Sequence, residues 1–202
     1  MLFASVESLA QAQDAATEPW WDEWEVADGF RLDTDTSGYD FPVAVAFVPS
    51  PGKGPGAPLY YVLELRGKLK VVTRDRKVHD FAADITNFLP SRELPLREGE
   101  AGSAGLCLDP VNGYVFVTFL YKKGSELKNA MVRFQAEPRT FGLVPKGSVT
   151  FESIFSDHPS AISHQIGPCQ VVDGQLFVSV GDAEQPKLAL DPSSPNGKIL
   201  RM

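Results

Sequence analysis

Two side chains with acid–base chemistry, His164 and Asp182, stand at the two ends of a predicted β-hairpin. The pair Asp173-Gly174 separates two apolar runs, and it favours a tight hairpin turn because it tolerates the positive φ angles that such a turn requires. Pairing of the two runs would bring His164 and Asp182 to the same end. An imidazole beside a carboxylate can act as a general base near neutral pH. A capping histidine and a turn aspartate are the alternative interpretation, which the hairpin alone leaves open.

The hairpin is the third copy of a strand-rich unit that recurs along the chain. The first two copies contain predicted strands at residues 41–49, 59–65, 68–72, 104–110, 114–119 and 130–134. Phe47, Leu108 and Val171 hold equivalent places in the three copies, 61 and 63 residues apart. Antiparallel units that recur at roughly this spacing are typical of β-propeller blades with long insertions. We therefore predict an all-β fold built from about three four-stranded blades.

Three blades cannot close a propeller ring. An open array would leave an inner face and strand edges bare, which natural folds avoid. Residues 198–202 also end the sequence within a predicted strand. We expect the chain to be the N-terminal half of a longer protein, and we expect the isolated piece to self-associate.

The first 18 residues differ in character from the rest of the chain. They are small and weakly apolar, and the segment 9–12 has the small-x-small pattern of a signal-peptidase site. A charged start and a long apolar core are missing, however. The remnant of an export signal and a disordered terminus are the two interpretations. Three tryptophans within residues 20–24 mark the start of the predicted folded part, 19–202.

Composition argues against nucleic acid as a partner and against a membrane span. The net charge is −7 and no cluster of Lys and Arg could follow a phosphate backbone, so nucleic acid is not an expected partner. No run of about 18 apolar residues exists, so the sequence predicts no membrane span.

Cys107 and Cys169 are the only cysteines, and they stand 62 positions apart in apolar strands. Two buried free thiols are the expected state for such residues. A disulfide would require the two strands to be neighbours, which the sequence does not reveal.

Several motifs occur in an order and spacing that are specific when taken together. They are Phe41-Pro42, Gly102-x-x-Gly105-Leu106-x-Leu108-x-Pro110, His164-Gln165-x-Gly167, Leu176-Phe177-Val178-Ser179-Val180-Gly181-Asp182 and Asn196-Gly197-Lys198-Ile199-Leu200-Arg201. From about residue 40 to its end, the chain resembles the soluble quinoprotein glucose/sorbosone dehydrogenases. These enzymes are six-bladed β-propellers that oxidise aldoses with pyrroloquinoline quinone (PQQ). The resemblance implies about three blades of an incomplete six-bladed ring.

The resemblance also implies roles for individual residues. His164 would be the general base that takes the proton from the anomeric hydroxyl of the sugar, and Asp182 would orient its imidazole. Glu100 and Gln165 would contact the substrate. The remaining two candidates, Gln185 and Lys187, would contact PQQ.

Further expectations concern the whole protein. A sugar substrate, an external electron acceptor and a periplasmic or secreted location follow from the resemblance. So does calcium, whose ligands are expected in the missing C-terminal half, and no metal site is predicted in this chain. Pro168 stands where the family commonly has arginine, and Asp109 where it commonly has histidine. A non-catalytic recognition module of the same family is therefore the alternative.

Overall fold

The computed structural model describes residues 24–85, 88, 101–142 and 149–202. The chain divides into two units, Met1–Asp35 and Thr36–Met202. All described strands lie in the second unit, which therefore contains the candidate site. The predicted leader at residues 1–18 lies outside the described residues.

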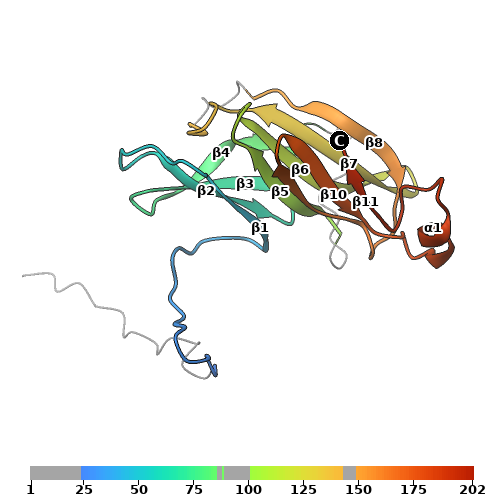
Figure 1. Ribbon diagram of the computed structural model, residues 1–202, viewed down its shortest axis with the longest axis horizontal. Helices are drawn as coiled ribbons and strands as arrows, with labels where there is room; N and C mark the ends of the chain where they lie inside the picture. Colours follow the sequence, from blue (N-terminus) through green and yellow to red (C-terminus); the bar gives the residue numbers. More distant parts are fainter. Residues whose placement is uncertain (1–23, 86–87, 89–100, 143–148) are drawn as a thin grey trace, which may run out of the picture. The chain divides into compact units, whose positions relative to one another are not determined.

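The second unit consists of three antiparallel sheets (Figure 1). The first contains β1 (Pro42–Phe47), β2 (Pro58–Glu64), β3 (Lys68–Thr73) and β4 (Val78–Asp84). The second contains β5 (Ser103–Asp109), β6 (Tyr114–Lys123), β7 (Glu126–Gln135) and β8 (Glu152–Pro159). The third contains β9 (Ile166–Val172), β10 (Gln175–Val180) and β11 (Lys198–Arg201), and α1 (Pro186–Leu190) lies between its last two strands. Each sheet is a meander of chain neighbours, as the recurring unit predicts.

The predicted hairpin of the third sheet is present. In the register of β9 and β10, Val172 faces Gln175 and Val171 faces Leu176. The two intervening residues have positive φ angles, 51° at Asp173 and 76° at Gly174. This is the turn geometry that an Asp-Gly pair favours. The third sheet has three strands among the described residues, where four were expected.

Two outer strands, β4 and β8, were not predicted. In β8 the side chains are exposed or only partly buried, so no strict alternation of apolar and polar residues marks the strand. An outer strand of a sheet packs on few neighbours, and its sequence is therefore weakly constrained. Only their pairing in the structure identifies these strands, β4 with β3 and β8 with β7.

The second sheet is buried on both faces because it packs between the other two. Val115, Val117 and Phe119 of β6 belong to a core cluster shared with Tyr61 and Leu63 of the first sheet. Successive residues of a strand point to opposite faces. The intervening residue Phe116 accordingly joins a cluster with Leu176 of the third sheet. This double burial explains the near-continuous apolar run in β6.

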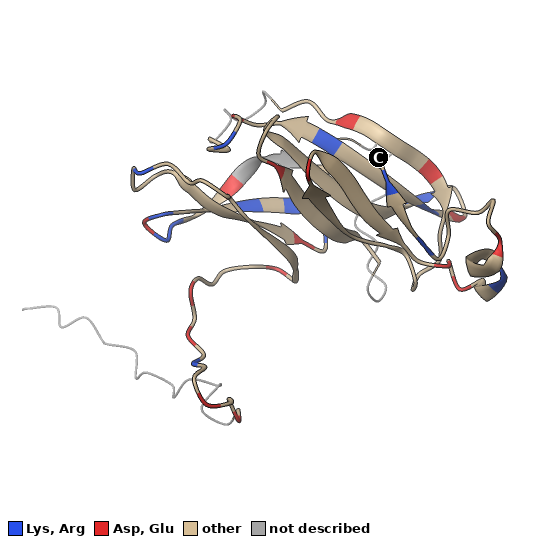
Figure 2. Cartoon of the chain, in the orientation of Figure 1, with Lys and Arg blue, Asp and Glu red and all other residues tan. Residues whose placement is uncertain are grey.

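Charged residues lie mainly on loops and on the third and fourth strands of the first two sheets (Figure 2). The strands β1, β5, β9 and β10 together contain a single charged residue, Asp109. Arg133 of β7 pairs with Glu152 of the outer strand β8 at 2.7 Å, and Lys70 of β3 pairs with Asp80 of the outer strand β4. Within the described residues, no helix has the length and apolar character needed to cross a membrane.

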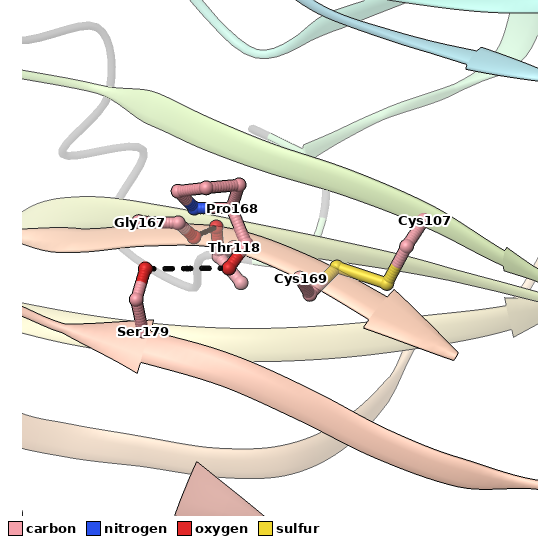
Figure 3. The surroundings of a disulfide bond; sticks show 6 residues. All are labelled: Cys107, Thr118, Gly167, Pro168, Cys169 and Ser179. Atoms are coloured by element: carbon pink, nitrogen blue, oxygen red, sulfur yellow. Dashed lines mark hydrogen bonds between the residues drawn. A yellow bond between two sulfur atoms is a disulfide. The ribbon is translucent and has the colours of Figure 1, made fainter. Parts of the chain in front are cut away.

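The first strands of the three sheets are neighbours, and a covalent bond joins two of them. β5 contacts both β1 and β9. Cys107 of β5 and Cys169 of β9 form a disulfide, with Cα atoms 5.6 Å apart (Figure 3). The expectation of two free thiols is therefore wrong. Cysteines 62 residues apart in sequence give no sign that their strands are adjacent. The two strands become neighbours because the second sheet packs on the third.

Candidate active site

His164 and Asp182 meet at one end of the β9–β10 hairpin. His164 lies two residues before β9, Asp182 lies two residues after β10, and Val180 pairs with Ile166 between them. The hydrogen bond expected from the hairpin is present, because His164 Nδ1 lies 2.8 Å from Asp182 Oδ1. The imidazole is 61% exposed and the carboxylate 19% exposed. The hairpin thus offers an accessible imidazole supported by a more sheltered carboxylate.

The hydrogen-bond partners determine where the imidazole carries its proton. An ionised carboxylate can only accept, so His164 Nδ1 donates to Asp182 Oδ1. In the neutral ring, Nε2 then holds the free lone pair. The same Oδ1 accepts a second hydrogen bond from the backbone N–H of Glu184, at 3.0 Å. These two donors fix the carboxylate, and the arrangement makes Nε2 the atom that can take a proton.

The loop after Asp182 folds back on the segment that carries His164. The backbone N–H of Ala183 donates to the carbonyl of His164 (3.2 Å), and that of Ser163 donates to Glu184 Oε1 (3.1 Å). His164, Ala183 and Glu184 have positive φ angles of 54°, 57° and 58°. Such angles are uncommon in residues with a side chain and cluster at functional sites. Glu184 is a site residue that the sequence analysis missed.

Gly181 permits the close approach of the two strand ends. A Cβ atom at this position would lie 2.0 Å from the carbonyl oxygen of His164 and 2.8 Å from that of Gln165. Both neighbours are backbone atoms and cannot rotate away. The close approach also allows the N–H of Gly181 to donate to the Gln165 carbonyl, at 3.0 Å. Any side chain at position 181 would therefore separate His164 from Asp182.

Gly181→Ala is expected to destabilise the fold by about 1–3 kcal/mol, because overpacking against backbone forces the strand ends apart. Denaturant unfolding measures this loss. Gly54→Ala is the matched control, since a Cβ there would meet nothing within 4 Å. Equal stability of the two variants would contradict the close approach.

Two buried asparagines hold the strand ends that carry the His–Asp pair. Asn129 of β7 is fully buried, and its Oδ1 accepts a hydrogen bond from the backbone N–H of Ile166 at 3.1 Å. Asn196 is 2% exposed, and its Nδ2 donates to the carbonyl of Gly181 at 3.1 Å. The sequence analysis identified neither role. An asparagine inside a strand or before one gives no signal of its partner.

The other predicted site residues differ in how closely the structure connects them to the His164–Asp182 pair. Glu100 lies outside the described residues. Gln165 is partly buried and directly follows His164. Gln185 and Lys187 are exposed, and the structure ties Gln185 to the pair through its backbone, whose N–H donates to the carbonyl of Asp182 at 3.1 Å.

Metal binding finds no support in the described part of the chain, where no three His, Cys, Asp or Glu side chains gather. His158 Nε2 lies 2.9 Å from Asn196 Oδ1.

Comparison with protein families assigns the chain to a family. The family described as glucose/sorbosone dehydrogenase matches residues 40–202. The chain belongs to the glucose/sorbosone dehydrogenase family. A search of curated proteins finds no match. Family membership agrees with the resemblance expected from the His164 and Asp182 motifs.

Solved structures show the same fold. An oxidoreductase described as a glucose dehydrogenase from Thermus thermophilus is 25% identical, with a TM-score of 0.63 over 86% of this chain and 46% of that chain. The PQQ-bound aldose sugar dehydrogenase of Streptomyces coelicolor is 22% identical, with a TM-score of 0.61 over 85% of this chain and 47% of that chain. This member of the glucose/sorbosone dehydrogenase family thus spans about half the length of these structures. Its three sheets are part of a β-propeller.

Proposed function

We propose that the complete protein containing this chain is a PQQ-dependent aldose dehydrogenase in which His164 is the general base. The observation that carries the proposal is the hydrogen bond of 2.8 Å between His164 Nδ1 and Asp182 Oδ1 on a largely exposed imidazole. Membership of the glucose/sorbosone dehydrogenase family supports the substrate class. A PQQ-bound aldose sugar dehydrogenase among the structural neighbours supports the cofactor.

The two residues of the pair have different tasks in this proposal. His164 Nε2 takes the proton of the anomeric hydroxyl while the hydrogen on the same carbon leaves as hydride, so the aldose becomes a lactone. Asp182 holds the imidazole through Nδ1 and stabilises the imidazolium that forms. Because Asp182 also accepts from Glu184, it stays in place when His164 changes its charge. PQQ, when bound, supplies the two-electron acceptor chemistry.

Two exposed side chains that follow Asp182 in the sequence fit the chemistry of PQQ. The cofactor is a quinone with several carboxylates, which amide and ammonium groups can bind. Gln185 and Lys187 supply one donor group of each kind, three and five residues after Asp182. Gln165, beside His164, and Glu100 are the proposed sugar contacts. The calcium ligands are proposed to lie in the part of the family fold that this chain does not span.

The disulfide supports export from the cytoplasm. Disulfides persist in oxidising compartments and are rare in the cytosol. The bond between Cys107 and Cys169 therefore favours a periplasmic or secreted location. There the reduced cofactor would pass its electrons to an external acceptor.

Asp182→Asn tests the proposal in the complete protein, loaded with PQQ and calcium and assayed for aldose oxidation with an artificial electron acceptor. We expect kcat to fall by at least about 10²-fold, because asparagine cannot stabilise the imidazolium; the same change in a Ser-His-Asp triad costs about 10⁴-fold. KM should change little, since Asp182 is not proposed to contact the sugar. Asp173→Asn is the matched control and should keep full activity, because it lies at the opposite end of the same hairpin.

A non-catalytic recognition module is the second candidate, and Pro168 in place of the family's common arginine favours it. The same assay separates the two functions. Binding of an aldose without turnover, in the presence of PQQ and calcium, would support the module and reject the dehydrogenase.

A further inference from the structure

Asn196 lies in the segment between α1 and β11. It contacts β8, the end of β10 and the start of β11. Its side chain is buried, with 2% of the residue exposed. Oδ1 lies 2.9 Å from His158 Nε2 of β8, and Nδ2 lies 3.1 Å from the carbonyl oxygen of Gly181. The adjoining backbone is held as well, because Lys198 Nζ donates to the Asn196 carbonyl at 3.1 Å. One amide therefore links the second sheet to the strand end that carries Asp182.

The direction of each hydrogen bond follows from what each group can do. The Gly181 carbonyl can only accept, so the Asn196 amide must present Nδ2 to it. The amide oxygen then faces His158, and His158 Nε2 must donate. His158 thereby keeps the amide in the orientation that Gly181 requires. Rotation of the amide would place two acceptors against each other at Gly181, and two donors against each other at His158 while its Nε2 carries the proton.

The held carbonyl belongs to the peptide bond between Gly181 and Asp182. That peptide is planar, so fixing its oxygen also fixes the position of the Asp182 Cα atom. On the other side of the pair, Ala183 donates to the His164 carbonyl, and Asn129 holds Ile166. The hydrogen bond of 2.8 Å between the two side chains thus depends on backbone that buried amides hold.

We propose that Asn196, oriented by His158, is a positioning residue that holds Asp182 in hydrogen-bond contact with His164. The proposal rests on the proposed function, since it deepens the role of the same pair. Asn196 acts through the Gly181 carbonyl and touches neither substrate nor cofactor. This positioning role explains why the Asn196 side chain is buried although its neighbours in sequence are partly or fully exposed.

The test uses the nitrogen-15 and proton NMR spectrum of the complete protein labelled at histidine. A hydrogen-bonded Nδ1–H of His164 gives a downfield proton resonance, which is assigned by its absence in His164→Gln. We expect this resonance to be lost in Asn196→Ala and in Asn196→Asp. The aspartate variant keeps the size of the side chain but cannot donate to the Gly181 carbonyl, so it separates hydrogen bonding from packing. It also provides the test if Asn196→Ala fails to fold.

Two further variants serve as controls. His158→Gln can still donate to Asn196 Oδ1, and we expect it to keep the resonance. Asp109→Ala removes a buried carboxylate that holds the β5–β6 turn through the N–H groups of Val111 and Asn112. It should lower stability and leave the resonance unchanged, because it does not touch the pair.

Kinetics of the PQQ-loaded protein provide the second measurement. We expect Asn196→Asp to lower kcat by up to about 10²-fold with KM nearly unchanged, the size of effect that follows when a mutation away from the reacting groups displaces them. An unaltered His164 resonance in Asn196→Asp would overturn the positioning role. Normal turnover in His164→Ala would instead reject the proposed function, while the resonance would still decide whether Asn196 holds the pair.

Discussion

His164→Ala in the complete, PQQ-loaded protein is expected to lower kcat for aldose oxidation by about 10²- to 10⁴-fold, the usual contribution of a general base. The reason is that no other group is proposed to take the proton of the anomeric hydroxyl. PQQ binding should remain largely intact, since the proposed contacts to the cofactor come from Gln185 and Lys187. The measurement is steady-state oxidation of an aldose, with bound PQQ determined by its absorbance after removal of free cofactor.

Two observations sharpen this test. Free imidazole should restore part of the activity of His164→Ala, because it can enter the vacated space and take the proton. His79→Ala is the matched control, since this histidine lies on β4 of the first sheet and its Nε2 lies 3.4 Å from the Thr73 hydroxyl. Turnover of His164→Ala at the rate of the control would reject the assignment of the base.

Removal of the disulfide is expected to lower the free energy of unfolding by about 4 kcal/mol. The bond closes a loop across a sequence separation of 62 residues, and its loss frees the unfolded chain by about this amount in the chain-entropy treatment. The variant is Cys107→Ala/Cys169→Ala, and the measurement is denaturant unfolding. A thiol titration under denaturing conditions should find no free thiol from this pair before reduction and two after it.

A reducing agent gives the control for this prediction. Reduction should lower the stability of the parent protein to that of Cys107→Ala/Cys169→Ala and should leave the variant itself unchanged. A stability difference below about 1 kcal/mol between the parent and the variant would mean that packing alone joins β5 to β9. The thiol count would then show whether the bond forms at all.

The sequence by itself predicted the local structure of the site. The Asp173-Gly174 turn requires backbone angles that few other residue pairs adopt, so the β9–β10 hairpin followed from it. The hairpin in turn brought His164 to Asp182, because residues at matching ends of paired strands must meet. The recurring strand units predicted the all-β class, and the family motifs added the glucose/sorbosone dehydrogenase assignment.

Contacts between distant segments required the tertiary structure. The disulfide requires β5 and β9 to be neighbours. The residues around Cys107 and Cys169 in the sequence do not indicate this. The outer strand β8 has no clear apolar alternation, and only pairing with β7 reveals it. The role of Asn196 depends on His158, 38 positions away, and on the Gly181 carbonyl. A hairpin is encoded by adjacent residues, whereas a buried amide takes its partners from whichever strands the packed sheets bring to it.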